Sequence, residues 1–225
     1  MVDRKAFREL SYGLYIITAV DGDRKVGCVV NTFNQVTSSP ARVSVAINKD
    51  NFTTGIVLAS GRFEASVLAE SAPMELIGRF GFQSSADIDK FADTAYALDE
   101  AGVPYVTEHT VSHFGARVIE TVDVGTHMLI VGEVEEASVL AESAPMTYAY
   151  YHEVKGGKTP AKASSYTPDE PVAPAPDPQA APATRIGWKC KICGYVIEVD
   201  ELPEDFQCPI CKQGREMFER IEITE

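Results

Sequence analysis

The sequence of 225 residues lacks a long apolar run and is poor in positive charge. No stretch approaches the roughly 20 consecutive apolar residues that a membrane-spanning helix needs. The 20 lysines and arginines face 33 aspartates and glutamates, which leaves a formal net charge of −13. Nucleic acids and anionic membranes bind clustered positive charge, so we expect neither nucleic acid nor a membrane as a partner.

The sequence also lacks the marks of export and of a Rossmann site. Its first ten residues carry charges throughout and no apolar segment of a secretory signal, so we expect a soluble, cytoplasmic protein. No G-x-G-x-x-G loop occurs, which argues against a Rossmann dinucleotide site. Apolar residues still make up 45% of the chain, enough for a folded core.

A proline-rich stretch divides the chain. Residues 167–184 hold six of the 13 prolines and no aromatic or basic residue. Such a stretch favours extended polyproline II and spans roughly 55 Å when fully extended. We predict a first domain at 1–160, a Pro/Ala-rich linker at 161–184 and a small domain at 185–225. The linker is either a passive spacer or a tether that lets the small domain visit more than one docking site.

The first domain is predicted to be mainly β with helical insertions. Short apolar or alternating runs between turn residues predict strands at Leu14–Val20, Lys25–Val30, Arg42–Ile47, Arg62–Leu68, Ala116–Val122 and His127–Val134. Helical patterns predict insertions at Asp3–Leu10, Phe52–Ala59 and Asp87–Tyr96. Several short strands of this kind indicate a closed or nearly closed barrel.

One sequence of eleven residues occurs twice. EASVLAESAPM stands at 64–74 and again at 136–146. A solenoid needs at least three copies at a fixed period, so the two copies do not indicate a repeat protein. We interpret them as two similar corners in which a strand leads into a turn.

Cysteine is scarce except near the C-terminal end. Four of the five cysteines form two Cys-x2-Cys pairs, Cys190 with Cys193 and Cys208 with Cys211, with 14 residues between the pairs. Without an export signal, a metal or redox site is favoured over disulfides. Two facing pairs make a tetrahedral site of four sulfurs, which suits zinc or iron. A domain this small would draw much of its stability from the metal.

The surroundings of these cysteines resemble rubredoxin. The similarity lies in Trp188–Tyr195, in Leu202–Cys211 and in Phe218. It implies a single iron held by four thiolates that carries one electron at a time. Two features depart from rubredoxins: the spacer is shorter, as in the tail of rubrerythrins, and Lys212 stands where a glycine is usual. A structural zinc ribbon stays an alternative.

The first domain resembles the flavin reductase-like family of FMN-binding split barrels. The motifs are residues 26–54, 80–85, 89–91 and 125–127, and the similarity covers most of residues 1–160. It implies FMN as the cofactor, NADH or NADPH as the electron donor, and a homodimer with FMN near the interface.

Candidate FMN-binding residues follow from the donor chemistry and from this resemblance. A polar turn before the helix predicted at Phe52–Ala59 offers donors for a phosphate, from Asn48, Lys49, Asn51, Thr53 and Thr54. The resemblance adds Lys90 at the phosphate, the isoalloxazine edge along Val30, Asn31, Thr32 and Gln35, and the motif residues Phe82 and Ser84. Taken singly, each of the polar residues could instead serve a turn or a helix cap.

The resemblance also selects a catalytic residue, His127, beside the flavin and the nicotinamide. Without it, a histidine at the start of an apolar strand is more often a buried core residue. Cys28, on an apolar strand, is expected to be a small buried residue. For Tyr148, Tyr150 and Tyr151, a reach into the site from the barrel end or from a second subunit stays an alternative.

The whole arrangement resembles the high-molecular-weight rubredoxins of anaerobic bacteria. It implies an oxidoreductase that passes electrons from NADH through FMN to an Fe(Cys)4 centre, and on to a flavodiiron protein that reduces O2 or NO. Two alternatives stay open. One is a flavin or ferric reductase that releases its reduced product, and the other is an FMN-binding protein with a structural zinc ribbon. The sequence does not choose between NADH and NADPH.

Overall fold

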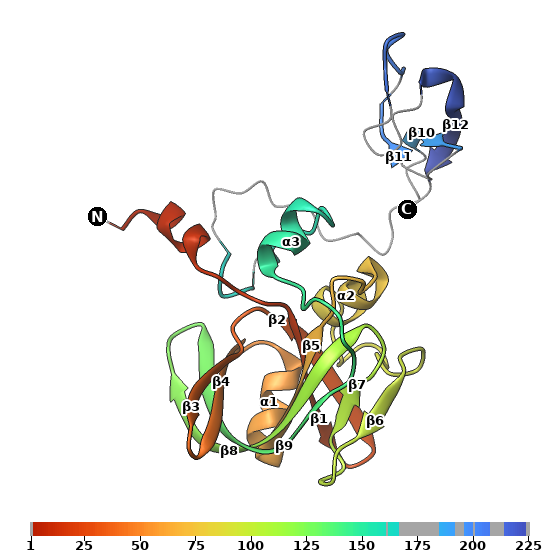
Figure 1. The fold of residues 1–225 in the computed structure, drawn as a ribbon. Coiled ribbons are helices and arrows are strands. Elements are labelled where there is room, and N and C mark those ends of the chain that lie inside the picture. The colour runs from red at the N-terminus through yellow and green to blue at the C-terminus, as the bar shows by residue number, and fades with distance from the viewer. Residues whose placement is uncertain are drawn as a thin grey trace. The chain divides into compact units, whose positions relative to one another are not determined.

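The computed structural model describes residues 2–160, 162–166, 185–191, 196–199, 201–207 and 214–223 (Figure 1). The chain forms two compact units, Met1–Ala173 and Pro174–Glu225, which are described separately below. The domain limits given above, 1–160, 161–184 and 185–225, stay predictions.

The larger unit is built on a seven-stranded antiparallel sheet with the strand order β2-β1-β5-β8-β9-β4-β3 (Figure 1). Its strands are β1 (Tyr15–Asp21), β2 (Arg24–Val30), β3 (Asn34–Ser38), β4 (Ala41–Asn48), β5 (Arg62–Leu68), β8 (Thr110–Asp123) and β9 (His127–Val139). A separate two-stranded ribbon pairs β6 (Tyr96–Leu98) with β7 (Pro104–Val106). The prediction of a mainly β fold is confirmed.

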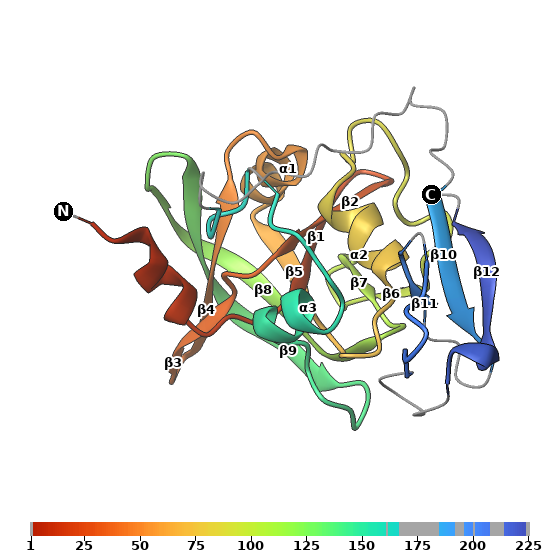
Figure 2. The same ribbon diagram turned by 90° about the horizontal axis from the view of Figure 1, so that it is seen from above.

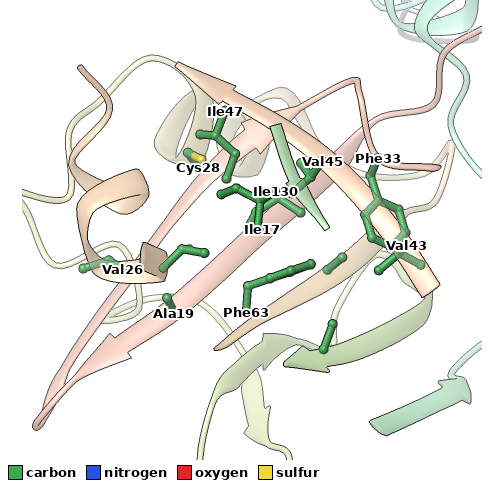
Figure 3. Packing of buried hydrophobic residues seen from close by; sticks show 13 residues of the cluster. Ile17, Ala19, Val26, Cys28, Phe33, Val43, Val45, Ile47, Phe63 and Ile130 are labelled. Carbon is green, nitrogen blue, oxygen red and sulfur yellow. The ribbon is translucent and has the colours of Figure 1, made fainter. Parts of the chain in front are cut away.

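Side chains from both halves of the sheet meet in one core (Figure 3). Ile17 of β1, Val26 of β2, Val45 of β4, Phe63 of β5 and Ile130 of β9 are all fully buried. Strands that lie far apart in the sheet order can share a core only if the sheet curls round on itself. The larger unit is therefore a barrel, as the pattern of short strands predicted.

Three helices and one 3-10 helix accompany the sheet. They are η1 (Arg4–Glu9), α1 (Phe52–Ser60), α2 (Met74–Gly81) and α3 (Tyr148–Glu153). The side chain of Asn51 caps α1, and Gly61 ends it with a positive φ of 67°, which glycine adopts without strain. The helix predicted at Phe52–Ala59 is confirmed, whereas α2 was not predicted. α2 and α3 lie on the same side of the barrel (Figures 1 and 2) and share a second core.

The helix predicted at Asp87–Tyr96 is wrong. The segment forms turns and bends, and β6 begins at Tyr96. Asp89 accepts a hydrogen bond from the Phe91 N–H at 2.9 Å, and the Thr94 hydroxyl donates to the Lys90 carbonyl at 2.8 Å. Local bonds of this kind compete with a helical ladder and stabilise turns instead.

The two copies of EASVLAESAPM lie on either side of β8. Glu64 in β5 and Glu136 in β9 are both paired with Gly115, and Ser66 and Ser138 are both paired with His113. After each strand the chain turns and enters a helix, α2 after the first copy and α3 after the second. This arrangement agrees with the interpretation of two similar corners.

The smaller unit holds a three-stranded sheet with the order β11-β10-β12. Its elements are β10 (Arg185–Cys190), β11 (Val196–Ile197), η2 (Arg215–Met217) and β12 (Phe218–Ile223). Leu202 and Phe218 are buried in its core, with Trp188 and Phe206 packed against them.

A membrane span is not found among the described residues, where no helix is long and apolar enough to cross a bilayer.

Candidate functional site

A pocket opens where the ends of β2 and β4 and the start of β9 meet α2 and α3. Apolar side chains make up much of its wall: Leu14, Val29, Val30, Ile47, Ile77 and Phe82. Six of the predicted site residues line it, namely Val30, Asn31, Asn48, Asn51, Phe82 and His127.

The strand register brings the polar residues of the pocket together. Asn48 at the end of β4 is the direct partner of His127 at the start of β9. Asn31 follows β2 and is 6% exposed. Three polar side chains that are distant in the sequence thus line one pocket. No local spacing in the sequence predicts that they come together.

His127 is buried, and its Nδ1 lies 2.8 Å from the Thr126 hydroxyl. The ring also forms a hydrogen bond with the Lys162 backbone. Burial lowers the pKa of His127 below its usual range, so the imidazole is neutral at pH 7. A neutral ring can both donate and accept a hydrogen bond.

The turn before α1 works first as a structural unit. Asn48 Oδ1 accepts from the Asp50 N–H at 2.9 Å, and Asn51 Oδ1 accepts from the Thr53 N–H at 3.0 Å. The Thr54 hydroxyl donates to the Asn48 carbonyl at 2.7 Å. Thr53 and Thr54 are buried and lie outside the pocket lining, while Asn48 and Asn51 combine the turn or cap role with a place in the wall.

Four other predicted residues lie away from the lining. Lys49 is exposed and pairs with Asp123 at 2.8 Å. The Thr32 hydroxyl donates to the Ala46 carbonyl at 2.8 Å, directly behind the wall. Gln35 is exposed on β3 and Ser84 accepts from the Ala86 N–H at 3.1 Å. Their roles toward a cofactor stay predictions.

Lys90 is buried, and its ammonium points into the protein. Nζ donates to the Gly27 carbonyl at 2.8 Å and to the Phe80 carbonyl at 3.0 Å. Burial lowers the pKa of Lys90 to about 8, and it raises the pKa of the neighbouring Cys28 thiol to about 11. Cys28 is 2% exposed, as expected for a small core residue. A phosphate contact of Lys90 is a prediction that this geometry leaves untested.

Residues after α3 complete the pocket and were missed. Lys158, Pro160 and Lys162–Ser164 line it, together with Tyr148 and Tyr151 of α3. The run of tyrosines was the one signal in the sequence for this side of the site. Residues 158–160 and 162–164 carry no periodic pattern or motif, so nothing in their sequence indicated that they line the pocket.

The predicted metal ligands are described only in part. Cys190 ends β10 opposite Phe218, and the N–H of the following Lys191 donates to the Met217 carbonyl at 2.8 Å. Cys193, Cys208 and Cys211 lie outside the described residues.

The class of this protein follows from the known families that the chain matches. The profile of the family described as "Flavin reductase like domain" matches residues 7–157, and that described as "Rubrerythrin, rubredoxin-like domain" matches residues 188–219. The chain therefore belongs to the flavin reductase-like family and carries a rubredoxin-like domain near its C-terminal end.

Three similar proteins support this assignment. The chain is 43% identical to the high molecular weight rubredoxin of Moorella thermoacetica, over 98% of this chain and 100% of that protein. It is 47% identical to a ferric-chelate reductase (NAD(P)H) of Archaeoglobus fulgidus, over 73% of this chain and 98% of that protein. The solved structure of the flavin reductase HpaC complexed with NADP+ is 25% identical with a TM-score of 0.56, and the match covers 64% of this chain and 90% of that one.

These matches settle the general activity. The chain is an NAD(P)H-dependent oxidoreductase of the flavin reductase family with the two-domain arrangement of a high molecular weight rubredoxin. A flavin in the barrel and iron in the rubredoxin-like domain follow from the two families.

Proposed function

We propose that the protein passes electrons from NADH to FMN in the barrel pocket, then to one iron held by Cys190, Cys193, Cys208 and Cys211, and finally to a soluble acceptor of the flavodiiron class. The observation that carries this proposal is the presence of both electron carriers' domains on one chain, matched end to end by a high molecular weight rubredoxin.

The donor set of the pocket suits FMN. Isoalloxazine is flat and apolar on its faces and polar along one edge. The pocket offers apolar walls such as Val29 and Ile47, with the amides of Asn31 and Asn48 for the polar edge. The start of α1 at Asn51 supplies peptide N–H groups, which bind phosphate well. FMN, when bound, takes a hydride from a nicotinamide and can release the two electrons singly.

His127 is proposed to orient the cofactor and the nicotinamide. Its Nδ1 is held by the Thr126 hydroxyl, which fixes the ring beside Asn48. Because the imidazole is neutral, it adds no positive charge and can hold a proton at one nitrogen while it accepts at the other. The buried apolar wall keeps water from the reacting edge.

Four thiolates suit iron as well as zinc, and the rubredoxin-like match favours iron. An iron of this kind carries one electron, so the chain converts a two-electron donor into one-electron steps. NADH rather than NADPH, the flavodiiron acceptor and a homodimer with FMN near the interface belong to this proposal and rest on the family resemblance.

The test is an anaerobic visible spectrum of the purified protein before and after NADH. Flavin and ferric-thiolate bands that both bleach support the complete path. A flavin that bleaches in a protein without an iron band contradicts it and favours a zinc ribbon. A matched run with NADPH decides the donor, and metal analysis of the same sample identifies the metal.

A second candidate is a ferric reductase, since the Archaeoglobus fulgidus relative with that activity shares 47% identity over the barrel portion. In that case a ferric chelate would be reduced at the pocket without the rubredoxin-like domain. Removal of the iron by the Cys208→Ser change would then leave ferric-chelate reduction at the wild-type rate.

A further inference from the structure

The pocket is crossed by the segment that leads toward the Pro/Ala-rich stretch. We call residues 158–160 and 162–166 the strap. In Figure 2 the strap runs from α3 toward the start of α1. Four of its residues, Lys158, Pro160, Lys162 and Ser164, are part of the pocket wall, although none belongs to a helix or strand.

The strap uses both ends of the Asn31 amide. Asn31 Nδ2 donates to the Ser165 hydroxyl at 2.8 Å, and the Ser164 hydroxyl donates to Asn31 Oδ1 at 3.1 Å. An amide oxygen can accept two hydrogen bonds and an amide nitrogen can donate two. Two adjacent serines of the strap therefore take one position at each end of this buried side chain.

A backbone carbonyl of the strap forms hydrogen bonds with two further polar side chains of the pocket, Asn48 and His127. The Lys162 carbonyl accepts from Asn48 Nδ2 at 3.0 Å, and it also forms a hydrogen bond with His127. The strap thus offers hydrogen-bond acceptors and a donor to these three side chains. The polar edge of an isoalloxazine ring offers the same combination through its carbonyl groups and its N–H.

The start and the end of the strap are held by different partners. Near α3, the Tyr148 hydroxyl lies 2.7 Å from the Thr159 hydroxyl, and the Tyr151 hydroxyl donates to the Lys158 carbonyl at 3.1 Å. Further along, the Ser165 hydroxyl donates to the Tyr148 hydroxyl at 3.3 Å. Lys162 Nζ lies 3.4 Å from Asp50, but both side chains are well exposed, and such pairs contribute little. The other hydrogen bonds of the later half go to Asn31, Asn48 and His127.

We propose that the strap and the flavin compete for Asn31, Asn48 and His127, so that flavin loading displaces residues 162–166 while residues 158–160 stay anchored on α3. This inference rests on the proposed flavin site. A ring edge that uses the same hydrogen-bonding positions of Asn31, Asn48 and His127 can reach them only when the strap has left them. The ring edge and the strap are therefore alternative occupants of one set of groups.

Displacement would lengthen the connection to the rubredoxin-like domain. The strap directly precedes residues 167–184. Freeing five residues adds up to roughly 17 Å to the span of an extended chain. The empty barrel would thus keep the tether short, and the flavin-loaded barrel would allow the electron carrier a longer reach.

The first experiment measures FMN affinity of the full-length apoprotein by titration, for the wild type and for the Ser164→Ala/Ser165→Ala double variant. A neutral hydrogen bond contributes roughly a two- to tenfold factor, so the variant should bind FMN about fivefold more tightly. Weaker binding would mean that the serines hold the flavin, and equal binding would mean that the strap does not oppose it; either result overturns the proposal. Ser138→Ala, an exposed serine on β9, is the matched control.

The second experiment follows amide hydrogen exchange of the strap with and without FMN. Residues 162–166 should exchange faster when FMN is present, while the buried strand around Ile130 stays unchanged. Slower exchange of residues 162–166 overturns the proposal, because the strap would then close over the flavin. FMN that binds without changing the strap defeats this inference alone, whereas a wild type that binds no FMN defeats the proposed function as well.

Discussion

The two redox sites of this chain are assembled in opposite ways. The four cysteines of the proposed metal centre fall within residues 190–211. The barrel pocket is lined by residues from Leu14 to Ser164, carried by β2, β4, β9, α2, α3 and the strap. A local site can be recognised from spacing alone, while a distributed site becomes visible only when the strands are paired.

The two regions also differ in what holds them together. The barrel packs two separate cores of buried side chains, with Ile16, Ile17 and Phe63 fully buried. The smaller unit buries Leu202 and Phe218 against four partly buried neighbours among its described residues. A domain of about 40 residues would draw much of its stability from a bound metal. We therefore expect the loss of one cysteine to abolish metal binding altogether, whereas a single change in the barrel pocket should lower the FMN affinity without abolishing the fold.

The largest effect is expected for Cys208→Ser. Loss of one thiolate should abolish iron retention and one-electron delivery to the acceptor, while NADH-driven reduction of the flavin continues at the wild-type rate. Iron content, the ferric-thiolate band and the rates of both steps are measured on the same preparation. Glu204→Gln, an exposed change in the same unit, is the control. If the acceptor is still reduced by Cys208→Ser, the proposed path from FMN through the iron to the acceptor is wrong.

The sequence predicted the fold well where pattern and local chemistry agree. The strand predicted at Arg62–Leu68 matches β5 residue for residue, although Phe63–Ser66 are buried on both faces of the sheet. The sequence Asp21-Gly22-Asp23 is typical of a hairpin turn, and it joins β1 to β2 with Gly22 at a φ of 58°. The pattern at Asp87–Tyr96 failed because side chains of that segment bond to its own backbone.

The pocket was predictable only in part. Family resemblance selected Asn31 and His127, the polar turn before the predicted helix selected Asn48, and the structure brings these three together. Lys90 carries the same kind of motif signal, yet its ammonium is bound by two backbone carbonyls. The direction in which a side chain points depends on packing between distant strands. The strap was missed for the same reason, since its contacts with Asn31 and Asn48 join residues that are distant in the sequence.

A bulky change in the pocket wall should have the next largest effect. Ala46 lines the pocket and lies between the buried core residues Val45 and Ile47, on the opposite face of β4. Ala46→Phe therefore fills the pocket and leaves the barrel core intact, and we expect FMN affinity to fall at least about 100-fold. The thermal midpoint reports whether the barrel is folded, and Ala46→Ser is the conservative control. Wild-type FMN affinity in a folded Ala46→Phe variant would place the flavin elsewhere.

A third variant probes a part of the barrel outside the pocket lining. Glu64 is fully buried, and its Oε1 lies 3.3 Å from Nδ1 of His113. The carboxylates of Asp99 and Glu136 are close enough to act on its charge. Burial, followed by the two neighbouring carboxylates, raises the pKa of Glu64 to about 9. The folded state thus keeps a proton that the unfolded chain loses near pH 4.5, so stability falls as pH rises from about 4.5 to about 9.

Glu64→Gln should remove that loss, because the amide keeps the shape without ionising. The thermal midpoint of the variant should exceed that of the wild type by an amount that grows between pH 7 and 9, on the order of 5 °C at pH 8.5. In this window His113, whose pKa burial lowers, is neutral in the folded state and adds no slope of its own. FMN affinity should stay unchanged. A constant difference across the pH range would show that Glu64 is ionised in the folded protein.

The smallest effect is expected at Lys49, because the local sequence and the structure indicate different roles for this residue. The local sequence predicts a phosphate contact, while the structure pairs its exposed ammonium with Asp123 at 2.8 Å. An exposed pair contributes less than about 1 kcal/mol to stability, and salt screens the attraction of such a lysine for a phosphate. Lys49→Ala should therefore weaken FMN binding only about threefold at low salt and less at high salt.

Asp123→Asn separates the two roles of Lys49. It removes the same ion pair but leaves the lysine free, so a phosphate role predicts FMN binding that is equal to or tighter than wild type in Asp123→Asn and weaker in Lys49→Ala. If both variants bind FMN as the wild type does, Lys49 is a surface ion-pair residue and the phosphate is held by the start of α1 alone. In that case the Lys49 ammonium, which the local sequence predicted as a phosphate ligand, would contribute nothing to FMN binding in the barrel pocket.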